Sequence, residues 1–284
     1  MPLLNRTVAA SATKPLVIAH RGASGLAPEN TLAAFRLALA LGADGVEMDV
    51  QLSADGEPIV IHDARVNRTT NGIGAVSRLT RTELKNLDAG AWFERRLIRR
   101  PRGRTIDRWP GASELSRETV PTLEEVLDFL APARVERIYV ELKGGRGNKE
   151  QLLESVLSLV QRFRAERSVT LLSFDHEIIH RAKRFAGDIR TAATFPARGR
   201  RLISTRSILR AAENAEVDEV ALHFGLVSRR AVEALHERGL SVSVWTANSK
   251  IAMRRLTACG VDSIMTNFPD RLRAVLDTPS QRRL

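Results

Sequence analysis

The sequence predicts a closed barrel of eight parallel β-strands that alternate with α-helices along the chain. Eight short apolar runs rich in β-branched residues recur, and amphipathic helical stretches separate them, as in parallel strands joined by crossover helices. The chain has 284 residues, and a barrel of this kind commonly forms one domain of about 250 residues. We therefore expect a single barrel domain over residues 1–284.

The expected strands are short and apolar, and the expected helices carry apolar residues at intervals of three and four. The strands are residues 16–19, 45–50, 137–142, 169–172, 189–193, 219–222, 241–245 and 263–265. The helices are residues 31–41, 122–130, 149–166, 176–185, 204–214, 228–238 and 250–259. Eight strand and helix units in one chain favour a closed barrel over an open sheet.

Several expected helix ends carry capping residues. Asn30 and Thr31 offer side-chain oxygens to the first helix, and residues 121–125 resemble a capping box. Gly239 and Gly260 stand where two helices should end, because glycine readily takes the left-handed conformation of a helix C-cap.

The segment between the second and third barrel strands is too long for a single connecting helix. We expect an extended stretch at 58–62, and then an insertion at the barrel rim formed by residues 63–120. Binding elements are commonly added at this place. The insertion should contain a glycine turn at 71–74 and a helix near 81–87.

Within this insertion, residues 94–108 form a basic block. It holds seven arginines, all within 95–108, against only Glu94 and Asp107. Such a block is typical of a solvated, mobile loop. The alternative is a lid or surface patch that attracts phosphate-bearing substrates or anionic lipid.

The composition is that of a protein with a substantial core, at 43% hydrophobic and 27% charged residues. The single cysteine, Cys259, cannot form an internal disulfide, which fits a reducing compartment. No apolar run approaches the roughly 20 residues that span a bilayer, and residues 1–15 lack the apolar core of a secretory signal. These features predict a cytoplasmic location.

The formal net charge of +11 raises the question of a nucleic-acid or membrane partner. Only six of the 44 basic residues are lysine, so the excess is arginine spread over many expected helix faces. We therefore expect no nucleic-acid partner, and only a weak contact with anionic membranes through 95–108. The same charge would attract a small anionic substrate.

Charged side chains gather where the first three barrel strands end, which is where chemistry gathers in such barrels. The first strand ends in His20 and Arg21, and a guanidinium matches the edge of a phosphate. Glu47 and Asp49 are two apart on the second strand, so their side chains point to the same face. Glu141 and Lys143 have the same spacing at the end of the third strand.

Two carboxylates that face each other in a barrel interior raise each other's pKa unless a cation lies between them. The alternative is that Glu47 and Asp49 meet solvent or an arginine, and spacing alone does not decide between this and a cation. With Glu141 as a third acid, the all-oxygen set suits a hard cation such as Mg²⁺ or Ca²⁺. Lys143 is then either a phosphate contact or a salt bridge that balances the acids.

Two histidines can serve one phosphodiester. His62 closes the extended stretch at 58–62, so it could reach the same rim as His20. One imidazole acting as base and the other as acid suits displacement of a poor alcohol leaving group. Trp245 ends the seventh strand and is a candidate substrate contact, although core packing is the commoner role of such a residue. His223 is a weaker candidate.

Many of these motifs together resemble those of the glycerophosphodiester phosphodiesterases. The resemblance covers roughly residues 16 to 274. It rests on IAHRGAS at 18–24, PENT at 28–31, GVEMDVQ at 45–51, HD at 62–63, LDAG at 87–90, VPTLEEV at 120–126, ELK at 141–143, SF at 173–174, VWT at 244–246, GVD at 260–262 and NFPD at 267–270.

The resemblance implies a TIM barrel with a small inserted subdomain and hydrolysis of glycerophosphodiesters to glycerol 3-phosphate and an alcohol. By similarity, the acid/base pair is His20 and His62, and the substrate phosphate meets Arg21 and Lys143. The ligands of one divalent cation, Ca²⁺ or Mg²⁺, are Glu47, Asp49 and Glu141.

Two departures from the family pattern put substrate preference in doubt. Asn267 stands where the family usually has an aspartate, and the arginine-rich piece before Pro121 is longer than usual. Two alternative functions remain open. One is a lysophospholipase D that acts on lysolipids at a membrane surface, and the other is a non-catalytic barrel that binds polyanions.

Overall fold

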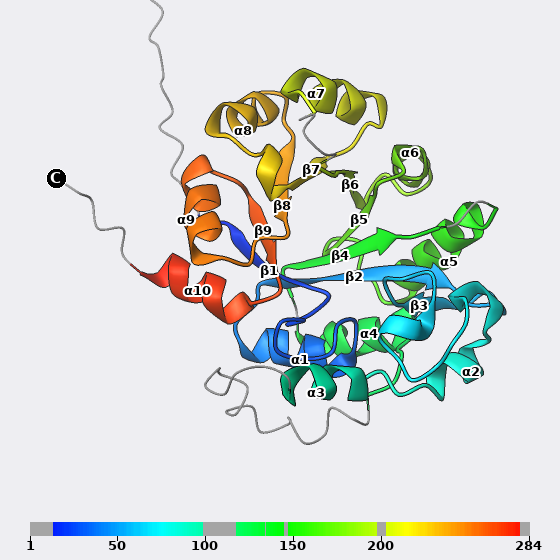
Figure 1. Ribbon diagram of the computed structural model, residues 1–284. Helices are drawn as coiled ribbons and strands as arrows, with labels where there is room; N and C mark the ends of the chain where they lie inside the picture. The colour runs from blue at the N-terminus through cyan, green and yellow to red at the C-terminus, as the bar shows by residue number, and fades with distance from the viewer. Residues whose placement is uncertain (1–13, 99–117, 134, 145–146, 198–202, 279–284) are drawn as a thin grey trace, which may run out of the picture.

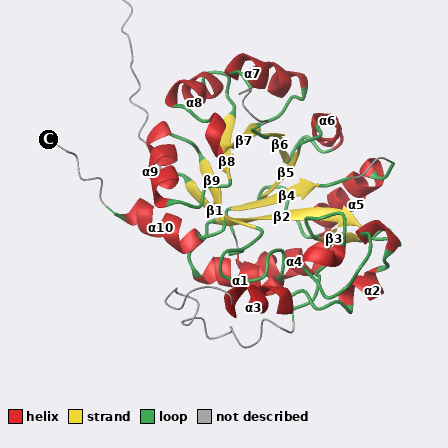
Figure 2. Ribbon diagram, in the orientation of Figure 1, coloured by secondary structure: helices red, strands yellow, loops and turns green. Residues whose placement is uncertain are grey.

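The computed structural model describes residues 14–98, 118–133, 135–144, 147–197 and 203–278. Eight parallel strands form a closed barrel with helices around it (Figures 1 and 2). The ring follows the order β1-β9-β8-β7-β6-β5-β4-β2 and is closed by pairing of β2 with β1. The predicted TIM-barrel fold is therefore confirmed.

The barrel strands lie within two residues of their predicted bounds at either end. They are β1 (Leu16–His20), β2 (Gly45–Leu52), β4 (Arg137–Leu142), β5 (Val169–Ser173), β6 (Arg190–Phe195), β7 (Glu219–His223), β8 (Ser241–Trp245) and β9 (Ser263–Thr266). The short strand β3 (Pro58–Val60) pairs antiparallel with the end of β2. It thereby brings the chain from β2 back along the rim toward His62.

All seven predicted helices are present. They are α1 (Leu32–Ala40), α4 (Leu123–Leu130), α5 (Lys149–Arg162), α6 (His176–Phe185), α7 (Thr205–Asn214), α8 (Arg229–His236) and α9 (Lys250–Cys259). Thr31 and Thr122 are confirmed as N-caps and Gly260 as a left-handed C-cap, whereas the C-cap of α8 is Glu237 and Gly239 follows two residues later with a φ of 74°. Helix α5 ends four residues earlier than predicted, because the chain turns at Arg164, which takes a positive φ of 52°.

Two helices were not predicted from the sequence. Helix α10 (Pro269–Asp277) begins with a proline in its first turn, a position that favours helix initiation. Helix α3 (Ala91–Ile98) covers the start of the basic block, so the prediction of a loop was wrong for residues 94–98. The rest of that block, 99–108, lies outside the described residues.

The described part of 63–120 has a small hydrophobic core of its own. Buried side chains from β3 and from the following loops and α2 (Arg81–Lys85) form this cluster: Ile59, Ile61, Val66, Val76, Leu84, Ala89 and Val120. The predicted helix near 81–87 is confirmed by α2. The division into a barrel and a rim insertion stays a prediction, which this separate cluster supports.

The barrel interior is filled by side chains rather than open. Side chains two apart on a strand share a face, so Tyr139 points inward on β4 one layer below Glu141. Tyr139 is 1% exposed and donates a hydrogen bond to Glu219 Oε1 at 2.8 Å. Because its one proton is used there, the 3.1 Å contact with Ser263 Oγ is donated by the serine. This buried set closes the barrel beneath the layer of acids.

We expect Tyr139→Phe to lower the free energy of unfolding by about 1–3 kcal/mol, because the buried carboxylate of Glu219 loses its hydroxyl donor. Urea denaturation measures this change. The matched variant Ser263→Ala removes the other partner of Tyr139 but leaves the bond to Glu219 in place, so its loss should be smaller. Equal losses in the two variants would contradict this account.

Candidate active site

Three acidic side chains meet inside the barrel at the carboxyl ends of β2 and β4. Glu47, Asp49 and Glu141 are all buried, and one oxygen of each lies within 4.8 Å of the others. The register explains this convergence, since Asp49 is paired directly with Glu141 across the two strands. The expected clustering of these acids is thus present in the structure.

Two basic side chains lie against this acidic cluster. Arg21 Nε is 3.1 Å from Asp49 Oδ2, and Lys143 Nζ is 2.5 Å from Glu141 Oε1 and 3.2 Å from Asp49 Oδ1. The backbone N–H of Arg21 also donates to Glu47 Oε2 at 2.9 Å. Asp49 therefore meets an arginine, which was one of the alternatives to a cation. Burial of Glu47 and Asp49 excludes the other alternative, that they meet solvent.

The surroundings push the three acids in different directions. Burial, followed by the charges of Asp49 and Glu141, raises the pKa of Glu47 well above its usual value. Burial and Asp49 raise the pKa of Glu141 to about 7. Burial would also raise the pKa of Asp49, but Arg21 and Lys143 outweigh it, so this pKa lies below its usual range. The cluster holds three acidic and only two basic side chains, so a further positive charge would bind favourably there.

The donor set fits a hard divalent cation. Asp49 Oδ1 and Glu141 Oε1 are buried and have no hydrogen-bond partner of good geometry among the described residues, although Lys143 Nζ is within ion-pair distance of both. A carboxylate oxygen paired with an ammonium keeps a second lone pair that can ligate a hard cation. Oxygen ligands lie about 2.3–2.6 Å from Ca²⁺, which agrees with a spread of 4.8 Å between the carboxylates.

His20 is oriented by Asn267. Its Nδ1 lies 2.8 Å from Asn267 Oδ1, and its Nε2 lies 3.9 Å from Glu47 Oε2. With the amide oxygen as acceptor, Nδ1 carries the proton and Nε2 of the neutral ring keeps its lone pair. Burial, followed by the charge of Arg21, lowers the pKa of His20 to about 4. The asparagine that departs from the family pattern thus still accepts a hydrogen bond from this ring.

The loop after β1 has the conformation that such a site requires. Arg21 and Gly22 both have positive φ values, 57° and 74°. A Cβ on Gly22 would lie 2.6 Å from the backbone of Ala34 in α1, so only glycine allows this close approach. The tight turn directs the backbone N–H of Arg21 toward Glu47.

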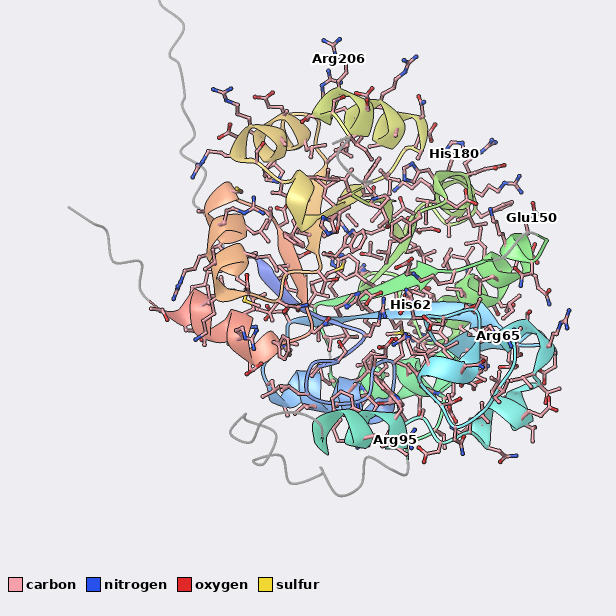
Figure 3. All side chains as sticks on the ribbon, in the orientation of Figure 1. His62, Arg65, Arg95, Glu150, His180 and Arg206 are labelled. Atoms are coloured by element: carbon pink, nitrogen blue, oxygen red, sulfur yellow. The ribbon has the colours of Figure 1, made fainter. Side chains whose placement is uncertain are left out.

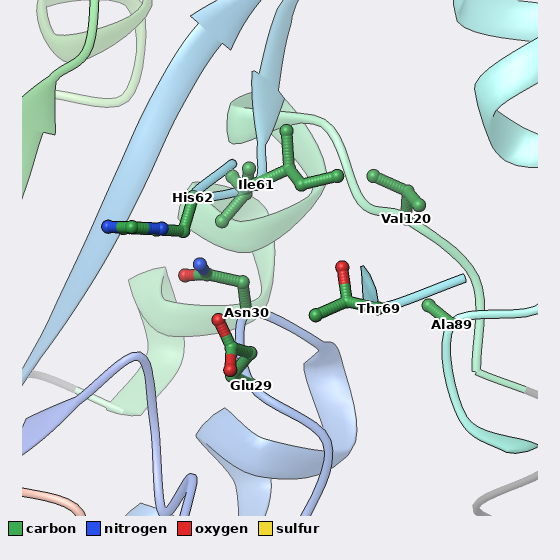
Figure 4. A pocket seen from close by; sticks show the side chains of 8 residues that line it. Glu29, Asn30, Ile61, His62, Thr69, Ala89 and Val120 are labelled. Carbon is green, nitrogen blue, oxygen red and sulfur yellow. The ribbon is translucent and has the colours of Figure 1, made fainter. Parts of the chain in front are cut away.

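His62 follows β3 and lines a small recess (Figure 4). Its Nδ1 is 2.6 Å from Asp63 Oδ1, which leaves Nε2 for chemistry. The recess is also lined by Glu29, Asn30 and Thr69, and its volume of about 10 Å³ is that of one water molecule. Asn30, which lines the recess together with His62, donates to Asp49 Oδ2 at 2.9 Å, so the recess adjoins the cluster that His20 also borders.

A further set of ion pairs near the site was not predicted as functional. Arg68 contacts Asp63 and Glu29, and Glu29 contacts Arg21. Glu29 belongs to the PENT motif and Asp63 to the HD motif, so the sequence marked both residues, but it indicated no role for either. Nothing in the sequence around Arg68 distinguishes it from the other arginines of the insertion.

Aromatic rings border the other side of the site. Trp245 makes edge contacts with Phe174 and His223 at centroid distances of 5.4 and 5.5 Å, and its Nε1 donates to Ala221 O at 3.1 Å. Phe174 is 42% exposed, and Lys143 Nζ lies 5.5 Å from its ring centroid. Trp245 therefore combines packing with a position beside the charged cluster.

Comparisons with known proteins agree with this geometry. The chain is 32% identical over 262 residues to the glycerophosphodiester phosphodiesterase of Caldanaerobacter subterraneus, covering 91% of this chain and 96% of that protein. A phosphodiesterase from Oleispira antarctica, solved with the product sn-glycerol-3-phosphate, superposes with a TM-score of 0.80 at 28% identity, covering 93% of this chain and 98% of that one.

A glycerophosphodiester phosphodiesterase from Agrobacterium tumefaciens superposes with a TM-score of 0.73 at 29% identity, covering 92% of this chain and 99% of that one. Within the described residues, no helix has the length and apolarity needed to cross a membrane. The model of the glycerophosphoryl diester phosphodiesterase family matches residues 20–271. The chain therefore belongs to the glycerophosphodiester phosphodiesterase family and is a phosphoric diester hydrolase.

Proposed function

We propose that this enzyme hydrolyses glycerophosphodiesters to glycerol 3-phosphate and an alcohol, with one divalent cation and two-histidine acid/base catalysis. The observation that carries the proposal is the convergence of three buried carboxylate oxygens within 4.8 Å, with His20 Nε2 3.9 Å from Glu47 and His62 in the adjoining recess. The Oleispira antarctica phosphodiesterase with bound sn-glycerol-3-phosphate supports this choice of product.

Glu47, Asp49 and Glu141 would hold the cation, which we propose to be Ca²⁺ or Mg²⁺. When bound, such an ion polarises a phosphoryl oxygen and stabilises negative charge that develops in the transition state. Arg21 and Lys143 stand on either side of Asp49. They supply a planar fork and a point charge, respectively, for the remaining phosphate oxygens.

The two histidines would exchange protons with the attacking and leaving oxygens. Asn267 and Asp63 engage the Nδ1 atoms of His20 and His62, so the Nε2 atom of each ring is the one available to substrate. One Nε2 accepts the proton of the nucleophile and the other donates a proton to the departing alcohol. The different partners, an amide and a carboxylate, suit rings that start in different protonation states.

The alcohol or glycerol part of the substrate would pack on Trp245 and Phe174. Phe174 has an exposed ring beside Lys143, so an apolar group attached to the bound phosphate could cover it. We also propose that residues 63–120 act as a rim insertion, because His62 and Asp63 stand where it departs from the barrel.

The relatives named above are glycerophosphodiester phosphodiesterases, so they favour this function over lysophospholipase D activity or a polyanion-binding barrel. The membrane contact considered for 95–108 falls mostly outside the described residues.

Replacing either histidine should remove most of the activity. We expect His20→Ala and His62→Ala each to lower kcat for glycerophosphocholine by about 10²–10⁴-fold, because general acid–base catalysis contributes that much. His236→Ala is the matched control, since His236 lies on α8 and pairs with Asp262. A loss below about ten-fold in either active-site variant would count against the two-histidine mechanism.

Removing the metal should abolish hydrolysis. Exhaustive chelation is expected to eliminate turnover of glycerophosphocholine, and added Ca²⁺ or Mg²⁺ should restore it. A second readout does not depend on activity: the ion should raise the Tm of the wild-type protein, because it binds only the folded state. Glu47→Gln should show a smaller rise. Undiminished turnover after chelation would rule out the metal.

Removing the Trp245 ring should weaken substrate binding. We expect Trp245→Ala to raise KM about ten-fold, the equivalent of ~1.4 kcal/mol of lost contact, and to change kcat less. Ile251→Ala is the control, because this side chain is apolar and 80% exposed on α9. Unchanged KM in Trp245→Ala would show that the ring only packs against its neighbours.

A further inference from the structure

We propose that Arg68 is a positioning residue of this site, which holds His62 and Arg21 in place through Asp63 and Glu29. The inference rests on the proposed function, because that function makes His62 and Arg21 contacts of the substrate. Arg68 ends the short 3₁₀ helix Val66–Arg68 in the rim insertion and does not itself touch the acidic cluster.

The guanidinium of Arg68 bonds two carboxylates at once. Its Nε and Nη2 donate to the two oxygens of Asp63 at 2.7 and 3.1 Å. Its Nη1 and Nη2 donate to the two oxygens of Glu29 at 2.8 and 2.7 Å. All three nitrogens of the fork are therefore used, in two bidentate pairs. Lysine could not reproduce this geometry, since its ammonium is a single point charge.

Each carboxylate then contacts a residue of the proposed site. Asp63 Oδ1 lies 2.6 Å from His62 Nδ1, and Glu29 Oε1 accepts from Arg21 Nη1 at 2.9 Å. Arg21 Nε in turn lies 3.1 Å from Asp49 Oδ2. The ion pairs thus run from His62 to Asp49 with no step longer than 3.1 Å.

This chain of contacts joins two separate parts of the fold. Asp63 and Arg68 come from the insertion, whereas Glu29 and Arg21 come from the loop between β1 and α1. Asp63 and Glu29 share no strand, and among the described residues no backbone hydrogen bond links their two loops directly, because β2 lies between β1 and β3. Arg68 provides such a link, and its partner Glu29 has a side chain only 11% exposed, where water screens the contacts less.

Loss of Arg68 would leave two carboxylates without their common cation. The hydrogen bonds from Arg68 lower the pKa of Asp63 to about 2, which reflects how strongly Arg68 stabilises this carboxylate. Without them, Glu29 would have only Arg21 as a partner, and Asp63 only His62, among the described residues. The pair of His62 with Asp63 and the pair of Arg21 with Glu29 would then lose the cation that joins them.

The test compares Arg68→Ala, Arg68→Lys and the control Arg65→Ala in the full-length, metal-loaded enzyme. Arg65 is exposed, lies three residues away in the same loop and has no ion pair among the residues described (Figure 3). We expect Arg68→Ala to lower kcat 10–100-fold, as is typical when a support of a catalytic group is removed. Arg68→Lys should restore little, and Arg65→Ala should match wild type.

Two further readouts separate positioning from a purely structural role. Guanidinium at millimolar concentration should raise kcat of Arg68→Ala without changing wild type. A low-field proton resonance from His62 Nδ1, assigned by its absence in His62→Ala, should be present in wild type and Arg65→Ala and weakened in Arg68→Ala. This signal does not depend on turnover, so it also tests the inference if glycerophosphodiesters prove not to be substrates.

Three outcomes would overturn the inference. One is a kcat for Arg68→Ala within about two-fold of wild type, far from the range typical of such supports. Another is full recovery of kcat in Arg68→Lys, which would show that any positive charge suffices. The third is a His62 resonance that is unchanged in Arg68→Ala measured below its Tm.

Discussion

The burial of three carboxylates in one barrel layer is the constraint on which the rest of the site depends. Glu47, Asp49 and Glu141 repel one another in a medium that solvates charge poorly. The positive charges of Arg21 and Lys143 and a backbone N–H from the turn after β1 offset that repulsion. They do not cancel it, because three acidic side chains face two basic ones. This imbalance favours added positive charge beside the acids, while Arg21 and Lys143 favour a bound anion.

The fold was predictable from the sequence because strand and helix periodicity reflect burial directly. The spacing of Glu47 with Asp49 and of Glu141 with Lys143 predicted that each pair shares a face, but not that the face is buried. Helix ends were predictable where a capping side chain marked them, as at Thr122. Helix α3 was missed because its arginines mask the apolar positions Trp92 and Phe93, which pack against the barrel.

The supports of the site were harder to predict because they join distant parts of the chain. Arg68 and Glu29 are 39 residues apart, and His20 and Asn267 are 247 apart. No periodic pattern relates such positions, and an arginine in a basic insertion carries no local sign of its partner. For the same reason the sequence could suggest that Asn267 alters the site, but not that its amide oxygen would accept from His20.

The separate hydrophobic core of the insertion has a consequence for how such enzymes diversify. A segment with part of its own core could be exchanged between related barrels if the graft kept its contacts with the host. These include the pairing of Ile59 of β3 with β2 and the packing of Phe93 of α3 in the hydrophobic core of the barrel. Any such chimera would have to carry an arginine able to clamp Glu29 of the host. The contact between this arginine and Glu29, rather than the length of the exchanged segment, would then determine which chimeras are active.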